Sequence, residues 1–218
     1  MNNPNYCSCD NSRCCCQPKC NDNYQSNYNS YSGDNKPYED HQKMSVNNGM
    51  SKQSCSVNSH YPTCNDVERN SEAIRLLLED YASAHSELSA ITSYMYQSAI
   101  LEDSYPEIAS PLSCIGIVEM KHLELLAAAI IALGGDPQYF SEINQSGEYE
   151  YWTGAFADYS KFVRDILLND IAAEQGAIAQ YIRHAEVIPI PCVQALLCRI
   201  VKDEQLHVRI LTEILNGL

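Results

Sequence analysis

The sequence predicts an all-α fold: a four-helix bundle of two antiparallel hairpins joined by a long crossover, preceded by a disordered N-terminal tail. Three observations predict it. Apolar residues recur at helical spacing from about residue 66 to the C-terminus. The motif Glu-x-x-His occurs twice, at Glu119 to His122 and at Glu204 to His207. Residues 1–65, in contrast, have a composition in which such periodicity is absent.

Residues 1–65 are rich in Asn, Ser, Cys and Tyr and contain almost no Leu, Ile or Val. Such a segment cannot bury enough apolar surface to offset its loss of conformational entropy, so we expect a disordered tail and a helical domain over 66–218. Eight of the eleven cysteines lie in this tail. They leave three interpretations open: a flexible reduced tail, cross-linking through cysteine and the six tail tyrosines, or binding of a soft metal.

The helical region divides into four expected helices, at about 68–102, 104–134, 157–188 and 190–218. The second is expected to begin with Ser104 as its cap, Pro106 in the first turn and Glu107 closing a capping box. The glycine pair Gly134-Gly135 is a typical helix end. Two short turns and one long connection, at about 136–156, give two hairpins joined by a crossover.

Four glutamates are expected at one level of this bundle. Each lies about 14–15 residues from the nearer predicted turn: Glu87, Glu119, Glu174 and Glu204. At 1.5 Å per residue, this places each about 21 Å from its turn. In a Glu-x-x-His pair the two side chains share one helix face, so the carboxylate and the imidazole can point to the same place. Four helices that offer Glu, Glu-x-x-His, Glu and Glu-x-x-His supply the ligands of a carboxylate-bridged two-metal site.

Six metal ligands are predicted. Glu119 and Glu204 are the bridging carboxylates, and Glu87 and Glu174 are the terminal ones. His122 and His207 each supply an imidazole to one ion. Carboxylates are hard oxygen ligands and imidazole suits borderline metals, so the set favours Fe or Mn, and admits Zn, over copper. Four carboxylates balance two divalent cations, which explains how so many acidic groups can be buried.

The repeat extends beyond the ligands, because Tyr94 and Tyr181 each follow the lone glutamate of their helix by seven residues. We expect each phenol to donate a hydrogen bond to a ligand carboxylate on a neighbouring helix; the alternative is that both are core residues. Asp203 is expected to hold a ligand histidine through its second ring nitrogen. His85 and His184 have no such pairing, and we expect them at the surface or at the rim of the bundle.

The formal net charge of −14 belongs to the helical region, because residues 1–65 hold five basic and five acidic residues and residues 66–218 hold nine and twenty-three. An acidic surface repels nucleic acid and anionic membranes, so neither is an expected partner. The sequence has no apolar run of the roughly 20 residues that span a bilayer, and its first residues are not a secretory signal. We therefore expect a cytoplasmic protein.

Residues 68–218 resemble the ferritin-like superfamily, specifically its bacterioferritin, rubrerythrin and manganese-catalase branches. The resemblance rests on Glu-Met-Lys-His at 119–122, on Asp-Glu-x-x-His at 203–207, and on the Glu-x6-Tyr spacing of the first and third helices. It implies a di-iron centre that oxidises Fe(II) with dioxygen or peroxide. It also matches Met120 to the haem-ligating methionine at a two-fold dimer interface; we do not expect haem, because methionine serves equally as an ordinary interface residue.

Three departures from this family narrow the expectation. The chain ends with the fourth helix, so the fifth helix of cage-forming relatives is not expected, and a homodimer or small homo-oligomer is. Position 177, where rubrerythrin carries a further glutamate ligand, is Ala177. No rubredoxin-like Cys-x-x-Cys pairs follow the bundle, so the electron donor is a separate and unidentified partner.

Two classes of function follow. The first is an oxidoreductase with two Fe or Mn ions that consumes peroxide or dioxygen, as a ferroxidase or peroxidase, with manganese-catalase-like peroxide disproportionation as the alternative. The second is a structural or cross-linking component in which the bundle is an assembly module, because the tail resembles the Cys- and Tyr-rich tails of bacterial spore-coat proteins. Iron storage in a closed shell is a third, less favoured function.

Overall fold

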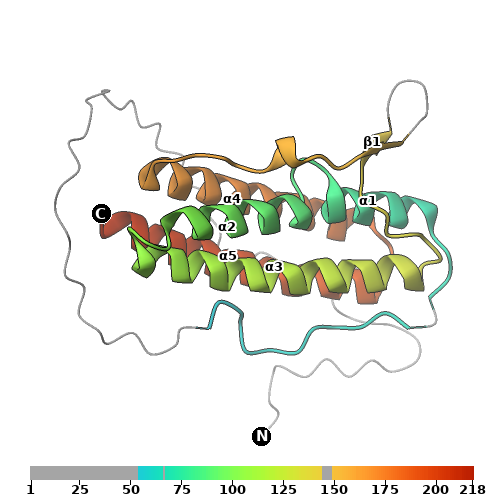
Figure 1. Cartoon of the computed structure of the whole chain (residues 1–218). Helices are drawn as coiled ribbons and strands as arrows, with labels where there is room; N and C mark the ends of the chain where they lie inside the picture. Colours follow the sequence, from blue (N-terminus) through green and yellow to red (C-terminus); the bar gives the residue numbers. More distant parts are fainter. Residues whose placement is uncertain (1–53, 66, 144–148) are drawn as a thin grey trace, which may run out of the picture. The chain divides into compact units, whose positions relative to one another are not determined.

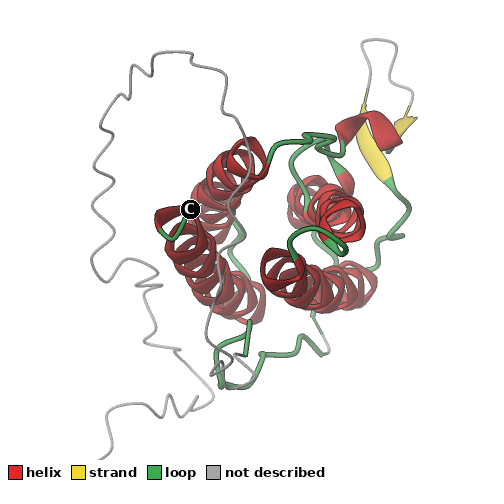
Figure 2. Ribbon diagram, turned by 60° about the vertical axis from the view of Figure 1, so that its left-hand side comes forward, coloured by secondary structure: helices red, strands yellow, loops and turns green. Residues whose placement is uncertain are grey.

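The computed structural model describes residues 54–65, 67–143 and 149–218, and it is mostly helical. The helices are α1 (Ser71–Ala82), α2 (Glu87–Leu101), α3 (Pro106–Ala132), α4 (Val163–Val187) and α5 (Pro191–Asn216). The hairpin of α2 and α3 packs against the hairpin of α4 and α5, with α1 continuing the line of α2 (Figure 1; Figure 2). The predicted all-α four-helix bundle with a long crossover is confirmed. None of the helices among the described residues is both long and apolar enough to cross a membrane.

The first predicted helix is wrong in one respect, because 68–102 is not continuous. It is divided into α1 and α2 by a break at residues 83–86. The hydroxyls of Ser86 and Ser89 both donate to the carbonyl oxygen of Ser83, at 2.7 and 2.9 Å, and the Ser86 side chain caps α2. Serine side chains compete with helical backbone hydrogen bonds in this way. The break makes Glu87 the first residue of α2, where the helix dipole favours a carboxylate.

Two other helix starts differ from the prediction. The N-cap of α3 is Tyr105, with no side-chain capping hydrogen bond, so the capping box of Ser104 and Glu107 is wrong; Pro106 does occupy the first turn. The helix ends before Gly134, whose φ of 79° suits glycine. Helix α4 begins at 163 rather than 157, and the backbone N–H of Asp158, in the preceding segment, donates to the Ser93 hydroxyl on α2, at 2.9 Å.

The crossover contains a short hairpin that the sequence did not predict. Strands β1 (Phe140–Ile143) and β2 (Tyr149–Tyr151) pair antiparallel, and a 3₁₀ turn follows at Gly154–Phe156. Tyr139 stacks on Tyr81 of α1 with ring centroids 5.5 Å apart, and the Trp152 indole donates to the Ser89 hydroxyl at 2.9 Å. The crossover is therefore fastened to α1 and α2.

Residues 54–65, called the arm below, belong to the segment expected to be tail, but they lie against the bundle. Disulfides join Cys55 to Cys114 of α3 and Cys64 to Cys192 of α5. The arm follows the outside of the bundle, drawn in cyan in Figure 1. For this stretch, the expectation of a disordered tail is corrected; the same expectation for residues 1–53, including the interpretations of their cysteines and tyrosines, lies outside the described residues.

The core consists of two apolar clusters with a polar layer between them. On α3, Ile115 belongs to one cluster and Leu126 to the other; on α5, Ile210 and Val201 are divided in the same way. The ligands predicted on these helices fall between the members of each pair. Packed apolar residues above and below therefore hold the polar layer in place.

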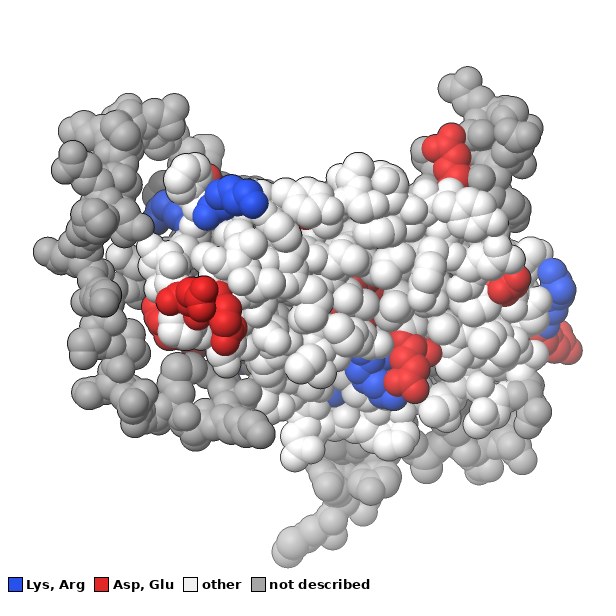
Figure 3. Space-filling view, in the orientation of Figure 1, with Lys and Arg blue, Asp and Glu red and all other residues white. Residues whose placement is uncertain are grey.

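Part of the negative charge lies inside the bundle rather than on its surface. Among the described residues, the buried acidic side chains are Asp80, Glu87, Glu119, Asp170, Glu174, Asp203 and Glu204. On the face shown in Figure 3, acidic and basic side chains are scattered among uncharged ones. The acidic surface expected from the net charge is thus weaker than the sequence total of −14 suggested.

Candidate metal centre

The structure brings all six predicted ligands together in the polar layer. They come from four helices, and each is at most 4% exposed: Glu87 on α2, Glu119 and His122 on α3, Glu174 on α4, and Glu204 and His207 on α5. They form two groups of possible metal ligands, each with its donor atoms within 4.8 Å of one another. The groups share Glu119 and Glu204, the two residues predicted to bridge the ions.

The two histidines face the carboxylates in the same way. Nδ1 of His122 lies 2.8 Å from Glu119 and 3.1 Å from Glu204. Nδ1 of His207 lies 2.8 Å from Glu204 and 2.9 Å from Glu119. The terminal carboxylates are farther away: Glu87 lies 3.7 Å from Nδ1 of His122, and Glu174 lies 3.8 Å from Nδ1 of His207. Nδ1 is therefore the atom that each imidazole offers to the centre.

The two predicted tyrosines contact ligand carboxylates across the bundle. The Tyr94 hydroxyl, from α2, donates to Oε1 of Glu174 on α4, and the Tyr181 hydroxyl, from α4, donates to Oε1 of Glu87 on α2. Both phenols are buried, and burial raises their pKa well above the usual value of 10. They therefore stay protonated and serve as donors that fix the terminal carboxylates.

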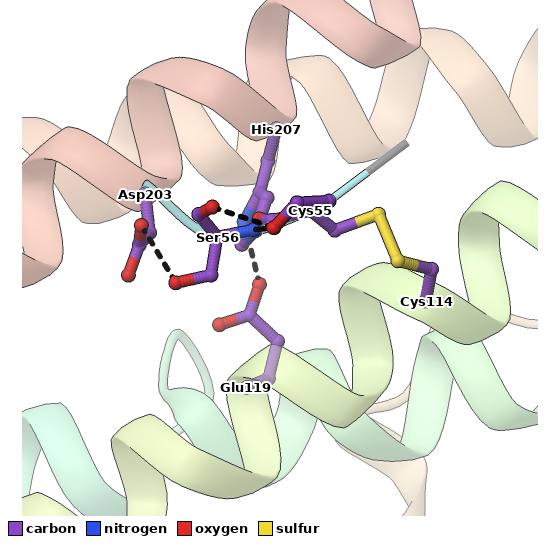
Figure 4. The surroundings of a disulfide bond; sticks show 7 residues. Cys55, Ser56, Cys114, Glu119, Asp203 and His207 are labelled. Atoms are coloured by element: carbon purple, nitrogen blue, oxygen red, sulfur yellow. Dashed lines mark hydrogen bonds and ion pairs between the residues drawn. A yellow bond between two sulfur atoms is a disulfide. The ribbon is translucent and has the colours of Figure 1, made fainter. Parts of the chain in front are cut away.

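The Nε2 atoms of the histidines have two different partners. Nε2 of His122 lies 3.1 Å from Oδ2 of Asp203, the contact expected from the sequence. Nε2 of His207 lies 2.9 Å from the backbone carbonyl oxygen of Cys55 in the arm, beside the Cys55–Cys114 disulfide (Figure 4). Sequence reasoning missed Cys55 because the arm was assigned to the tail. The signal available was the presence of separate cysteines on the predicted bundle helices, which could pair with cysteines of the tail.

The cluster binds protons tightly in the absence of cations. Burial lowers the pKa of both histidines, but the nearby carboxylates outweigh it, Glu204 and Glu87 for His122 and Glu119 for His207, so that each pKa is raised well above its usual value. Positively charged imidazoles are thus the form that these carboxylates favour.

The carboxylates divide into two kinds. Burial, with the charge of Glu119, raises the pKa of Glu87 and Glu174 well above the usual range. Burial also raises the pKa of Glu119, but the charge of His207 and the hydrogen bond with His122 outweigh it and lower the net pKa below the usual range. Glu119 is therefore a carboxylate on which negative charge persists.

The donor set fits two divalent cations. Among the described residues, Oε1 of Glu119 and Oε1 of Glu204, the two carboxylates common to both groups, are buried and accept no hydrogen bond of good geometry; a histidine Nδ1 lies 2.9 Å from the first and 3.1 Å from the second. Divalent cations at this position would replace the imidazolium charge that the two buried carboxylates otherwise face. Carboxylate and imidazole donors together suit Fe, Mn or Zn.

A cavity of about 320 Å³ leads to the centre between α2 and α4. It reaches all four ligand carboxylates, and the exposed residues His85 and Asn169 line its outer part, so that it opens to solvent. Its wall includes the small side chains of Ala90, Ala173 and Ala177. Ala177 occupies the position at which the resemblance would place a further glutamate ligand. A small molecule can therefore approach the carboxylates from this side.

Two further predicted residues lie outside the centre. Met120 is 43% exposed on α3, and the expectation that it is an ordinary interface residue rather than a haem ligand stays a prediction. His184 was expected at the surface or rim, and this is wrong: it is buried, with Nδ1 2.9 Å from Oδ2 of Asp80. His184 lies on α4, which packs against α1, and its partner Asp80 lies on α1. The two residues are about a hundred positions apart, so no local pattern indicates the contact.

Comparison with known proteins agrees with this architecture. The family model described as Rubrerythrin matches residues 81–215. A manganese catalase from Anabaena, KatB, is 26% identical, with 70% of this chain and 75% of that chain covered at a TM-score of 0.62. The diiron bacterioferritin of Desulfovibrio desulfuricans is 28% identical over 67% of this chain and 79% of that one, at a TM-score of 0.56.

A bacterioferritin from Mycobacterium tuberculosis, at 23% identity, has the same fold, with a TM-score of 0.58 and coverage of 69% of this chain and 87% of that one. No curated protein matches the chain. The predicted ferritin-like bundle is confirmed by these likenesses.

Proposed function

Because this chain belongs to the rubrerythrin family, we propose that it is an oxidoreductase in which two Fe or Mn ions react with peroxide or dioxygen. The observation that carries the proposal is the buried pair of ligand groups joined through Glu119 and Glu204. A buried set of this size and charge has no simpler explanation in the packing of the bundle.

In this proposal, each ion would have one histidine and one terminal glutamate of its own. Glu87 and His122 would hold one ion, Glu174 and His207 would hold the other, and Glu119 and Glu204 would serve both. When bound, the two ions supply the electron-transfer chemistry and a template for the oxygen–oxygen bond.

The protein's own groups determine access to the centre and where protons lie. The cavity beside the ligand carboxylates, with Ala90, Ala173 and Ala177 in its wall, is large enough to admit peroxide or dioxygen. Tyr94 and Tyr181 keep their protons and hold the terminal carboxylates in a fixed orientation. Metal binding displaces the protons that the two histidines otherwise hold, so binding is expected to weaken as pH falls.

Two reactions compete within this proposal. One is oxidation of two Fe(II) ions by one peroxide, which takes up two electrons and two protons and leaves two waters. The other is disproportionation of two peroxides to one dioxygen and two waters, which needs no reductant. The likeness to a manganese catalase supports the second, and the likeness to a diiron bacterioferritin supports the first.

The experiment is to load the metal-free protein separately with Mn(II) and with Fe(II) and to follow peroxide loss and dioxygen release, with and without a reductant. Dioxygen release by the Mn form alone supports the catalase reaction, and peroxide loss that tracks Fe(II) oxidation supports the ferroxidase reaction. No turnover by either loaded form contradicts the proposal. Glu213→Gln, an exposed change on α5, is the matched control for variants of the ligands.

A structural role is a second candidate, favoured by the arm's two disulfides. Disulfides persist in oxidising surroundings, so a final location in an assembly such as a spore coat accounts for them better than the cytoplasm does. Deletion of residues 1–53, which keeps the arm, tests this role: loss of assembly with unchanged metal content supports it, and unchanged assembly contradicts it. Light scattering on the same samples tests the proposed homodimer or small oligomer.

A further inference from the structure

We propose that the arm is a positioning element of the metal centre: it sets the orientation of both ligand histidines through their Nε2 atoms, and its two disulfides hold it in register. The inference rests on the proposed two-metal function for its purpose but on separate contacts for its evidence. Neither histidine is exposed at all; the arm supplies the group behind His207 and holds the Asp203 carboxylate that lies behind His122.

The arm contacts His207 directly. The carbonyl oxygen of Cys55 lies 2.9 Å from Nε2 of His207, and a carbonyl can only accept, so Nε2 carries a proton in this contact. That leaves Nδ1 of His207 as the atom facing Glu119 and Glu204. The tautomer that suits metal binding is thus selected by the arm's backbone.

The first disulfide places this carbonyl. Cys55 is 4% exposed and is bonded to Cys114, which lies on α3 five residues before the ligand Glu119. Figure 4 shows the arm crossing between α5, which carries His207, and α3, which carries Cys114 and Glu119. The acceptor of the α5 histidine is therefore covalently fixed to the helix that supplies a shared carboxylate.

The arm reaches His122 through Asp203. Oδ1 of Asp203 accepts from the backbone N–H of Val57 at 2.7 Å and from the Ser56 hydroxyl at 3.3 Å. Oδ2 accepts from the Tyr61 hydroxyl at 2.5 Å and faces Nε2 of His122 at 3.1 Å. Both oxygens of this carboxylate are thus oriented by the arm.

Arg199 completes this support from α5. Its guanidinium lies 2.7 Å from Asp203 and donates to the carbonyl oxygens of Val57 at 2.6 Å and Ser59 at 3.1 Å. Its charged centre lies 4.1 Å from the centroid of the Tyr61 ring. A single cation therefore ties Asp203 to the arm's backbone and to its tyrosine.

The two disulfides fix the arm to the bundle near its two ends. The arm residues that contact His207 or Asp203 lie at the first disulfide or between the two. Cys55 lies at the His207 end, and Cys64, bonded to Cys192 in the first turn of α5, follows Tyr61 by three residues.

Cys55 carries the acceptor of His207 and adjoins Ser56 and Val57, which donate to Asp203, so loss of its disulfide should loosen His207 most and His122 less. Loss of the Cys64–Cys192 disulfide should loosen the Tyr61 contact with Asp203 and therefore His122 alone. A segment that only stabilised the fold would loosen both together.

The test uses metal-free protein, so that it does not depend on the proposed function. NMR measures solvent exchange of the Nε2 protons of His122 and His207. We expect Cys55→Ser/Cys114→Ser to speed exchange at His207, and Cys64→Ser/Cys192→Ser to speed it at His122, each by about tenfold or more as local opening becomes easier. Tyr61→Phe, which keeps the ring over Arg199, should act on His122 alone.

The control is Tyr159→Phe, which removes a phenol bond to Gly154 far from the arm and should change neither proton. If a disulfide variant does not fold, Tyr61→Phe decides the matter for His122. Unchanged exchange in every variant, or equal response of both histidines to each variant, overturns the proposal.

Metal affinity gives a second reading on the same variants. Competition with a chelator should show about 10- to 100-fold weaker Mn(II) binding for the ion beside the loosened histidine, as expected when an outer partner is lost. Wild-type affinity for both ions in all folded variants contradicts the proposal. If the wild-type protein binds no metal but the variants change histidine exchange as expected, the proposed function is contradicted and the positioning role of the arm is supported.

Discussion

The two halves of the candidate metal centre have matching candidate ligands and different supports. One half contains Glu87 and His122, and the other contains Glu174 and His207. In each half a tyrosine from the opposite hairpin donates to the terminal glutamate, and Nδ1 of the histidine faces both shared carboxylates. Behind the histidines the halves diverge, with the Asp203 carboxylate in one and a backbone carbonyl in the other.

The internal repeat of the sequence therefore determines which candidate ligands occur in each half, but not which groups lie behind them. A carboxylate partner makes an imidazole a more basic ligand than a carbonyl partner does. We therefore expect the Glu87/His122 half to hold its ion more tightly than the Glu174/His207 half. The predictions below remove first what the halves share and then what distinguishes them.

Removing a shared ligand should have the largest effect. Glu204→Ala takes one carboxylate from both halves, so both ions should be lost, with a fall in affinity beyond the roughly 10- to 100-fold that an outer partner costs. Titration calorimetry with Mn(II) measures this, with Glu213→Gln as the control. A variant that still binds one ion with wild-type affinity would show that the halves do not share this carboxylate.

The two buried aspartates beside the centre differ in the same way as the histidine supports. Asp80 has His184 as a partner, whereas Asp170 has the neutral amide of Gln97, at 2.9 Å. Burial raises the pKa of Asp170 from 3.8 to about 7. Stability from this raised pKa is complete below pH 3.8 and is lost as pH rises through about 7.

Asp170→Asn should therefore gain stability relative to wild type as pH rises between these values. The shift corresponds to at most about 4 kcal/mol. Urea unfolding of the metal-free proteins between pH 4 and pH 8 measures it. A difference between the two proteins that stays constant over this range would contradict the prediction.

Asp203→Asn should affect one half only. The amide keeps the shape of the side chain but removes its charge, so the ion beside His122 should bind about 10- to 100-fold more weakly while the ion beside His207 is unchanged. Stepwise metal release to a chelator distinguishes the two ions. Equal weakening of both would mean that Asp203 acts on the fold as a whole.

The tyrosines test the similarity of the halves. Tyr94→Phe and Tyr181→Phe each remove one buried hydrogen bond to a terminal glutamate, and each should lower the free energy of unfolding of the metal-free protein by about 1–2 kcal/mol. Thermal or urea denaturation gives both values. Costs that differ several-fold would show that the halves are less alike than their contacts indicate.

The sequence predicted that the six candidate ligands would lie together, because their placement follows from local rules. Helical pitch determines which residues share a face. The distance of each glutamate from its predicted turn placed all four at one level of the bundle, without knowledge of how the helices pack. The tyrosine contacts follow from the same spacing. The fold class follows from apolar periodicity, which persists even where the first helix is broken at residues 83–86.

The arm could not be predicted in this way. Its residues lack the apolar periodicity that indicates order, and what orders them is distant in sequence: Cys114, Cys192, Arg199 and Asp203. Hydrogen bonds between the arm and α5 join residues about 140 positions apart, which no local pattern indicates. The hairpin of the crossover was missed because strands of three and four residues give too short a pattern.

In the proposed function, one chain holds two metal ions through its shared carboxylates, Glu119 and Glu204. The most direct measurement is the metal content of purified protein by elemental analysis, with native mass spectrometry to count ions per chain. The account predicts two ions of Fe or Mn per wild-type chain and none in Glu204→Ala. A wild-type protein that binds no metal when supplied with Mn(II) and Fe(II), or a Glu204→Ala protein that keeps both ions, would contradict it.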